Sequence, residues 1–254
     1  MAADLDLSSF AEGGIDRIIH RRFFARATSG VFVEVGAAGP RYLSNSAFYR
    51  SLGWRVIAIE PNPAFADEYR RQGLEVLQYA CGERDQDDVS FTLVHSHGIE
   101  HAGGGLTFES MSALSVDPRV AKLRDELVTS TIRTDMRRLD TILSRRAAEV
   151  TEIDILSIDV EGWELPVVRG LDFGRYRPKV CIVENLFRDE AYPRELCARG
   201  YELWSRPYPN EIYVRRDLLS PPERVVRRAR RLATSVWRSL RGKAAAPGAP
   251  AVPA

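Results

Sequence analysis

Carboxylate side chains stand within or just after several short apolar runs in this chain. The runs are 31–36, 54–59, 154–160 and 180–184, and the acidic residues are Glu34, Glu60, Asp159, Glu161 and Glu184. A carboxylate inside an apolar run is costly unless it is paired or functional. Carboxylates attract cations and accept hydrogen bonds from hydroxyls, whereas a pyrophosphate requires glycine-rich amides and basic groups. The pattern therefore favours a cationic or hydroxyl-rich ligand, although each acid is also compatible with a salt-bridged or solvated structural role.

A turn of small residues follows the first of these runs. It reads Gly36-Ala37-Ala38-Gly39, and such residues allow the backbone to approach a ligand closely. Glu60 comes 24 residues after Gly36, a position from which a carboxylate can accept hydrogen bonds from both hydroxyls of a ribose. The full G-x-G-x-x-G pattern of dinucleotide-binding proteins is absent, and the turn is also compatible with an ordinary strand-to-helix connection.

A parallel sheet would bring these residues together. Strands are predicted at 31–36, 54–59, 74–80, 154–160 and 180–184, after a leading helix from about Asp16, with helices near 44–52, 64–72, 139–148 and 192–199. Parallel neighbouring strands must be joined by crossover segments, which these helices would provide, and ligands bind beyond the carboxyl ends of the strands. Two further strands, predicted at 201–204 and 211–214, are joined only by residues 205–210. That connection is too short for a crossover, so these two strands should form an antiparallel hairpin.

Residues 81–153 are predicted to form an insert between the third and fourth strands, and such an excursion usually carries local function or a lid. Its own elements would be strand-like runs at 89–94 and 129–133, which could pair, and a helix near 118–127. A glycine-rich stretch between these runs contains His95, His97 and His101. The histidines are compatible with exposed side chains, with metal ligands, or with one catalytic histidine, for which His101 is the candidate.

Composition and cysteine usage limit the class of protein. With 254 residues, 44% apolar and 28% charged, the chain matches one globular α/β domain with appendages. Its three cysteines, Cys81, Cys181 and Cys197, are too widely spaced for a disulfide framework or a structural zinc site, which favours a reducing compartment. The N-terminus lacks the basic residues of a signal peptide, and no apolar run approaches the length of a membrane span. We therefore expect a cytoplasmic protein, at most peripheral to a membrane.

Charge is divided unevenly along the chain, although its net value is only +1. Residues 1–214 carry 26 basic and 33 acidic side chains, whereas residues 215–254 carry 10 and 2. Ser220 and Glu223 form a capping box for a helix whose apolar residues recur at helical spacing among arginines. This basic amphipathic helix could pack on the acidic body or on a second subunit, lie on an anionic membrane surface through residues 220–243, or bind nucleic acid. We expect no nucleic-acid partner, and the sequence indicates no oligomeric state.

Four segments in fixed order carry a more specific pattern. They are Val31 to Gly39, Val56 to Pro63, Arg138 to Leu143, and Ile153 to Gly170, which reads I-D-I-L-S-I-D-V-E-G-W-E-L-P-V-V-R-G. Together they resemble the FkbM family of S-adenosylmethionine-dependent methyltransferases over roughly residues 30–214. The first loop of that family usually reads G-A-N-x-G. Here Ala38 replaces the asparagine, and Pro40 stands where the last glycine would be.

The resemblance implies an α/β, Rossmann-like class I methyltransferase fold with a mostly parallel sheet and a terminal antiparallel hairpin. It also implies S-adenosylmethionine as methyl donor, whose cationic end suits Glu34 and Asp159 and whose ribose suits Glu60. The expected cofactor contacts are Glu34, Gly36, Ala37, Gly39, Glu60, Pro61, Asn62, Ala80 and Asp159. The candidate bases for the acceptor are Asp159, Glu161 and His101. Mg²⁺ held by Asp159 and Glu184 is left open because oxygen ligands suit it, but no metal site is assigned.

The expected organisation is a helical cover (1–29), a methyltransferase domain (30–216), a basic helix (217–243) and a disordered tail (244–254). The expected function is O-methylation of a small hydroxylated molecule, namely a sugar, glycolipid or polyketide-type metabolite. One alternative is a nicotinamide-dependent Rossmann oxidoreductase. The other is a non-catalytic methyltransferase-like module.

Overall fold

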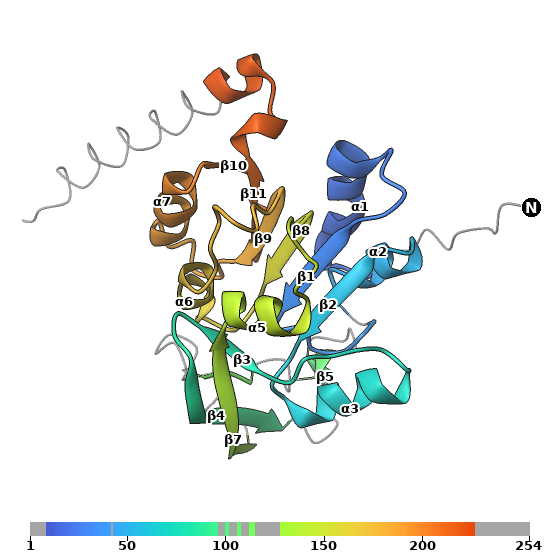
Figure 1. Ribbon diagram of the computed structural model, residues 1–254, viewed down its shortest axis with the longest axis vertical. Helices are drawn as coiled ribbons and strands as arrows, with labels where there is room; N and C mark the ends of the chain where they lie inside the picture. The colour runs from blue at the N-terminus through green and yellow to red at the C-terminus, as the bar shows by residue number, and fades with distance from the viewer. Residues whose placement is uncertain are drawn as a thin grey trace, which may run out of the picture.

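The central sheet joins distant parts of the chain in the computed structural model (Figure 1). The structure describes residues 9–41, 43–95, 100–101, 106–107, 112–114 and 128–226. Within these residues the largest sheet has six strands in the order β10-β11-β9-β8-β1-β2. The strands are β1 (Val31–Val35), β2 (Arg55–Ile59), β8 (Ile155–Ile158), β9 (Val180–Glu184), β10 (Tyr201–Ser205) and β11 (Asn210–Arg215). The four strands β2, β1, β8 and β9 run parallel, and β11 pairs antiparallel with both β9 and β10.

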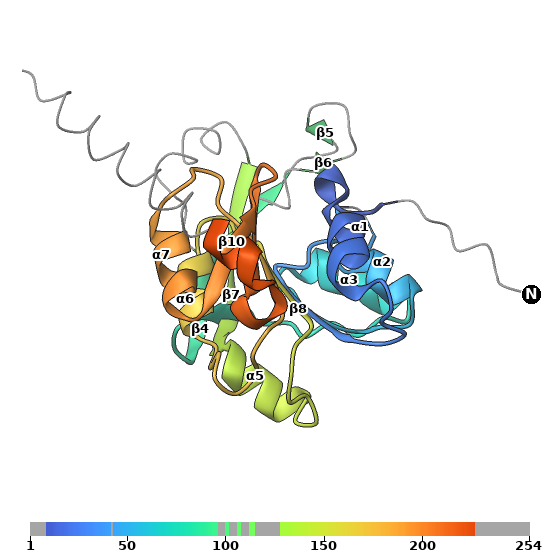
Figure 2. The same ribbon diagram turned by 90° about the horizontal axis from the view of Figure 1, so that it is seen from above.

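Helices cover both faces of this sheet, as the view from above shows (Figure 2). On one side lie α1 (Ile15–Ile19), its continuation η2 (His20–Phe24), α2 (Ala47–Ser51) and α3 (Pro63–Arg71); on the other lie α5 (Leu139–Arg146), α6 (Glu164–Arg169) and α7 (Ala191–Ala198). Successive strand residues face opposite layers: Phe32 packs with the α1 layer, and Val33 packs with the α5 layer. Because both faces are buried, the strands are nearly continuous apolar runs. The predicted α/β class with a mostly parallel sheet is confirmed.

The third predicted strand, 74–80, is wrong in its placement. Only Leu77 bridges to β2: its amide donates to the carbonyl of Ala58 at 2.8 Å, and its carbonyl accepts from the amide of Glu60 at 3.1 Å. From Ala80 the chain turns into β3 (Ala80–Gly82), which pairs with β7 in a separate sheet. The reason is burial. Among residues 74–79 only Leu77 is buried, so a full edge strand here would bury little additional apolar surface.

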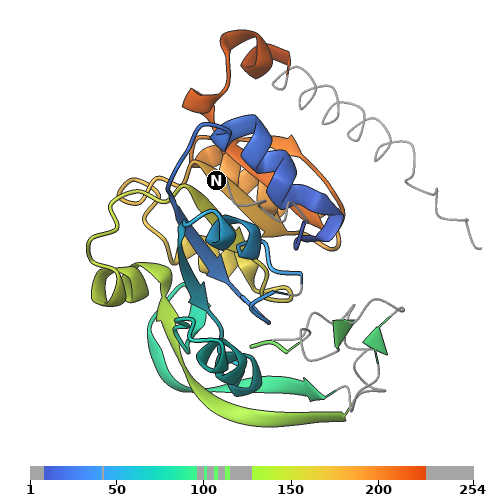
Figure 3. The same ribbon diagram turned by 90° about the vertical axis from the view of Figure 1, so that its right-hand side faces the viewer.

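The predicted insert forms a second sheet, the curved ribbon at the bottom of Figure 3. Its long strands, β4 (Gln86–His95) and β7 (Val128–Arg138), pair antiparallel with Val94 opposite Thr129. This confirms the predicted pairing of 89–94 with 129–133. The backbones of β5 (Glu100–His101) and β6 (Leu106–Thr107) form a further short antiparallel pair within the glycine-rich stretch. The helix predicted near 118–127 lies outside the described residues.

The described part of the chain ends in the first turns of a helix at 221–226, after η4 (Arg216–Leu218). The carboxylate of Glu223 accepts hydrogen bonds from the amide and the hydroxyl of Ser220 at 3.0 and 2.8 Å, so the half of the predicted capping box in which Glu223 reaches back to Ser220 is formed. The guanidinium of Arg22 also donates to Glu223, at 2.7 Å. The predicted continuation to residue 243 and the tail beyond it lie outside the described residues. Among the described helices, none has the length and apolar character needed to span a bilayer.

Candidate active site

The parallel strands end in register at one edge of the central sheet. Val35 of β1 pairs with Ile59 on one side and with Ile158 on the other, and Ile158 also pairs with Val183. The residues that directly follow these four are Gly36, Glu60, Asp159 and Glu184. The sheet therefore brings together one glycine and three carboxyl side chains, which the sequence places in four separate segments. This edge is where parallel sheets bind their ligands.

Gly36 is required by the close approach of the β1 turn to the end of β8. A Cβ atom added at Gly36 would lie 1.7 Å from the carbonyl oxygen of Asp159, and the residue has a left-handed φ of +75°. The amides of Gly36 and Ala37 both donate to the carbonyl of Ile59, at 3.0 and 3.2 Å. The turn is thereby attached to β2 as well. Ala37 is buried with Ala58 and Tyr69, so its side chain forms the floor of the turn.

Ala38 adopts the left-handed conformation, with φ of +43°. Asparagine tolerates this region better than other non-glycine residues, whereas for alanine the steric crowding of Cβ makes it unfavourable. The turn is therefore formed here with an alanine at a left-handed position. The amide of Ala38 donates to Glu60 at 2.9 Å, so the turn still reaches β2. Gly39 follows, close to the carboxylate of Glu68.

Glu60 is almost fully buried and connects the β1 turn to the start of α3. One oxygen accepts from the amide of Ala38 and the other from the amide of Asn62, at 2.9 and 2.8 Å. Burial raises the pKa of Glu60 to about 7; the two amide hydrogen bonds oppose this shift, and the charge of Glu34 adds to it. Asn62 in turn caps α3 by accepting from the amide of Ala64 at 3.0 Å, with Pro63 in the first turn. Pro61, between them, is buried.

Glu34 is engaged by the segment 44–46 on the side of the sheet facing α2. Its carboxylate accepts from the amides of Asn45 and Ser46, at 2.9 and 3.2 Å, and from the hydroxyls of Ser44 and Ser46. Burial raises the pKa of Glu34, and these hydrogen bonds together with the charge of Arg50 counteract the rise. The contacts that the structure shows for Glu34 therefore fix the loop that follows the β1 turn. Ala80, another expected cofactor contact, is buried at the start of β3.

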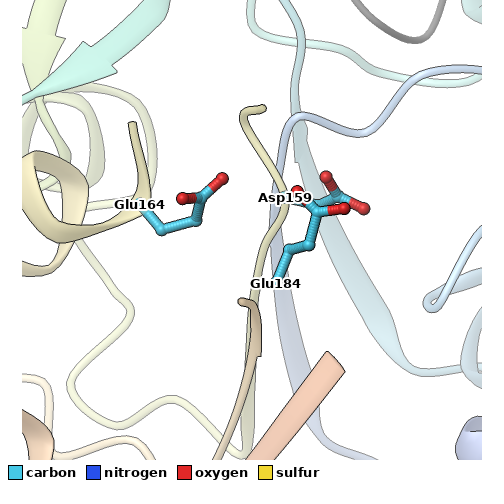
Figure 4. A group of neighbouring side chains, drawn as sticks. All are labelled: Asp159, Glu164 and Glu184. Carbon is cyan, nitrogen blue, oxygen red and sulfur yellow. The ribbon is translucent and has the colours of Figure 1, made fainter. Parts of the chain in front are cut away.

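Three carboxyl groups meet at the ends of β8 and β9. Each of Asp159, Glu164 and Glu184 offers an oxygen within 4.8 Å of the others, and Figure 4 shows Glu164 facing the other two across a gap. Burial raises the pKa values of Asp159 and Glu184 well above their usual range, and the negative charge of Glu161 adds to both shifts. Carboxyl groups so placed hold protons or a cation between them.

Glu164 holds the turn that carries Asp159 and Glu161. It is buried, and one of its oxygens accepts from the amides of Val160 and Gly162 at 3.1 and 2.8 Å. The backbone between these amides is left-handed at Glu161, with φ of +58°, and again at Gly162, with φ of +97°. For glutamate this conformation is unfavourable, so the paired hydrogen bonds to Glu164 stabilise it.

The hydroxyl of Tyr192, on α7, donates to the second oxygen of Glu164 at 2.6 Å. Sequence reasoning missed both residues. Glu164 could have been found as the third acid of the D-V-E-G-W-E segment, whereas nothing in the sequence links it to Tyr192. The helix α6 that begins at Glu164 was not predicted either, because it has only six residues and contains Pro166.

A cavity of about 280 Å³ lies next to these carboxylates, between the turn after β8 and α7. Its lining includes Glu161, Glu164 and Glu184 together with the aromatic residues Trp163, Phe187 and Tyr192. Of the candidate bases, Asp159 lies beside the β1 turn at Gly36, and Glu161 lines the cavity. His101 lies in β5, and its side chain is outside the described part of the chain.

Comparison with known proteins agrees with this arrangement. The model of the methyltransferase FkbM domain matches residues 34–203, which is most of the chain and includes all four residues at the sheet edge. No curated protein is similar enough in sequence to be called a relative. The mixed α/β architecture with a mostly parallel sheet also fits a methyltransferase fold. The chain therefore belongs to the FkbM methyltransferase family.

Proposed function

We propose that the protein is an S-adenosylmethionine-dependent methyltransferase with a Rossmann-like class I fold. Its acceptor would be a hydroxyl group on a sugar, glycolipid or polyketide-type metabolite. The observation that carries the proposal is the row Gly36, Glu60 and Asp159 at the carboxyl edge of three adjacent parallel strands, within the segment matched by the FkbM methyltransferase model.

The residues of this edge fit the proposed cofactor. Glu60 is buried at the end of β2, where a carboxylate can accept hydrogen bonds from two ribose hydroxyls. The turn Gly36 to Gly39 offers small residues, so that the backbone can approach the ligand. Asp159, when ionised, would supply negative charge for the cationic end. When bound, S-adenosylmethionine supplies a methyl group activated by the positive charge on its sulfur. Nothing in the family match calls for Mg²⁺, and the proposal assigns no step to a metal.

Asp159 is the proposed base. An acceptor hydroxyl must lose its proton during methylation, and a positioned base accelerates such a reaction by about 10² to 10⁴-fold. Burial and the neighbouring acid groups raise the pKa of Asp159 well above its usual range, which makes its ionised form a stronger base than an exposed carboxylate. Glu161 lines the adjacent cavity and, with His101, is the alternative base.

Titration calorimetry with S-adenosylmethionine and with NAD tests the class of enzyme. We expect binding of the first and none of the second; the reverse result would identify the oxidoreductase alternative. A screen of hydroxylated metabolites for methyl incorporation then tests catalysis, and a protein that binds neither cofactor would be the non-catalytic module. With an accepted substrate, Asp159→Asn should lower kcat by about 100-fold or more. Activity within about threefold of the unmodified protein would exclude Asp159 as the base, and Glu161→Gln and His101→Asn would then be compared.

A further inference from the structure

The N-terminal helix presents a basic outer face. One side of α1 and of its continuation η2 is buried against the sheet, and the residues that these two helices leave exposed are Ile18, Arg21 and Arg22. Arg26 is exposed in the turn that follows. Residues 17–33 contain four arginines and no acidic residue. The outer face of the N-terminal helix is therefore positively charged.

The C-terminal helix begins beside this face. The guanidinium of Arg22 donates to the carboxylate of Glu223 at 2.7 Å. Figures 1 and 3 show the blue N-terminal helix and the red C-terminal segment together, at the end of the molecule opposite the ribbon of β4 and β7. We call the exposed arginines and aliphatic residues of both helices the basic corner, which consists of Ile18, Arg21, Arg22, Arg26, Arg224, Val225 and Val226.

The arginines of the basic corner have few acidic counterparts in the described part of the chain. No carboxylate there pairs with Arg21, Arg26 or Arg224. Asp16, on the same helix, is fully buried and accepts hydrogen bonds from its own segment. The sequence that follows the described residues, 227–243, adds seven basic side chains and no acidic one. Such a concentration of one charge attracts an extended anionic partner.

The aliphatic residues of the basic corner decide which kind of anion fits. Ile18, Val225 and Val226 are 48%, 68% and 50% exposed. Nucleic acid is bound mainly through its phosphates, to which aliphatic side chains contribute little. At the surface of a bilayer, by contrast, aliphatic side chains enter the headgroup region while arginines contact anionic headgroups. The combination of exposed arginine and aliphatic side chains therefore favours a lipid surface.

We propose that the basic corner binds the protein to anionic lipid bilayers. The sequence by itself predicts membrane contact only as one possibility for residues 220–243. The folded domain adds the N-terminal helix to this surface, because the ion pair of Arg22 and Glu223 holds the two helices together. Contact through two joined elements is stronger than through one, since the second element binds at a high effective concentration. The proposal is independent of the proposed function, because it concerns where the protein acts and not what it methylates.

The test is sedimentation of the full chain with phosphatidylcholine vesicles that contain or lack phosphatidylserine. We expect binding to the first kind of vesicle and none to the second. Arg21→Gln combined with Arg26→Gln should weaken the binding at least tenfold, because each basic residue near an anionic surface contributes a factor of about five in affinity. The matched control combines Arg71→Gln with Arg146→Gln, at exposed positions of α3 and α5. It removes the same charge and should change the affinity less than twofold.

A second variant tests the aliphatic part of the surface without changing any charge. Val225→Ser combined with Val226→Ser should weaken binding to the anionic vesicles at least threefold. The substituted residues of all three variants are exposed, so each variant should unfold in urea at the same midpoint as the unmodified protein.

Three results would overturn the proposal. The first is unchanged vesicle binding when Arg21 and Arg26 are replaced, which would limit any membrane contact to the residues after 220. The second is binding of double-stranded DNA that the same variant loses, with no binding to either kind of vesicle, which would indicate a nucleic-acid surface. The third is a dimer in light scattering that the variant loses, again without vesicle binding, which would indicate a second copy of the chain.

Discussion

The ionisation of Glu60 should control how tightly the protein binds S-adenosylmethionine. Only the ionised carboxylate can accept hydrogen bonds with both oxygens while the amides of Ala38 and Asn62 also donate to it. With a pKa of about 7, Glu60 is about nine-tenths ionised at pH 8 and about one-tenth ionised at pH 6. If the ribose hydroxyls bind the ionised form, the affinity should therefore fall about tenfold between these pH values.

Glu60→Gln provides the control, because any titration of the ligand itself affects the variant and the unmodified protein alike. Affinities are measured by titration calorimetry at pH 6, 7 and 8 for both proteins. The ratio of the affinity of the unmodified protein to that of Glu60→Gln should change about tenfold across this range. Glu75→Gln, which changes an exposed acid, should behave like the unmodified protein. A ratio that stays constant between pH 6 and pH 8 would refute the assignment of Glu60 to the cofactor.

The same group predicts a change of stability with pH. The folded pKa of about 7 lies above the ordinary value of 4.5, so the folded state binds more protons than the unfolded state between these values. The stabilisation is fully present below pH 4.5 and is lost as the pH rises through 7; it amounts to about 3 kcal/mol. The free energy of unfolding in urea should fall by about this amount from pH 5 to pH 8 in the unmodified protein, relative to its change in Glu60→Gln. Parallel pH curves for the two proteins would contradict the buried, proton-binding state of Glu60.

Three further changes test other parts of the structure. Ala38→Gly should raise the free energy of unfolding by about 0.5 to 1 kcal/mol, because glycine has no steric cost at a left-handed φ; destabilisation in urea would contradict this backbone geometry. Tyr192→Phe should lower the free energy of unfolding by about 1 to 3 kcal/mol, because Glu164 loses a buried donor. The control variant Tyr208→Phe should have little effect, because the Tyr208 side chain is 66% exposed. Equal effects of the two variants would exclude a structural role for the Tyr192 hydroxyl. The predicted membrane contact of the basic helix requires that deletion of residues 220–254 weaken sedimentation with anionic vesicles, and unchanged partitioning would exclude that contact.

Local sequence patterns were sufficient to locate the four parallel strands and the residues at their carboxyl ends. Strands buried on both faces must be continuous apolar runs, so β1, β2, β8 and β9 could be located, and with them the positions of Gly36, Glu60, Asp159 and Glu184. The register that aligns these residues follows from the same rule, because parallel strands end at a common edge. The prediction of an edge strand at 74–80 was wrong for the converse reason. Most apolar residues of this segment are not fully buried, and the residues from Ala80 onward pair with β7 instead of β2.

Contacts between distant segments were decided only by the tertiary structure. The sequence determined that acidic groups would gather at one edge of a parallel sheet, because strand patterns and turn residues are local properties. It could not show that the oxygens of Glu34 are occupied by residues 44–46, or that Tyr192 reaches Glu164 from α7. Nor could it show that aromatic residues of three separate segments line one cavity with Glu184. Such contacts depend on how the layers pack against each other, and packing is set by the whole chain at once.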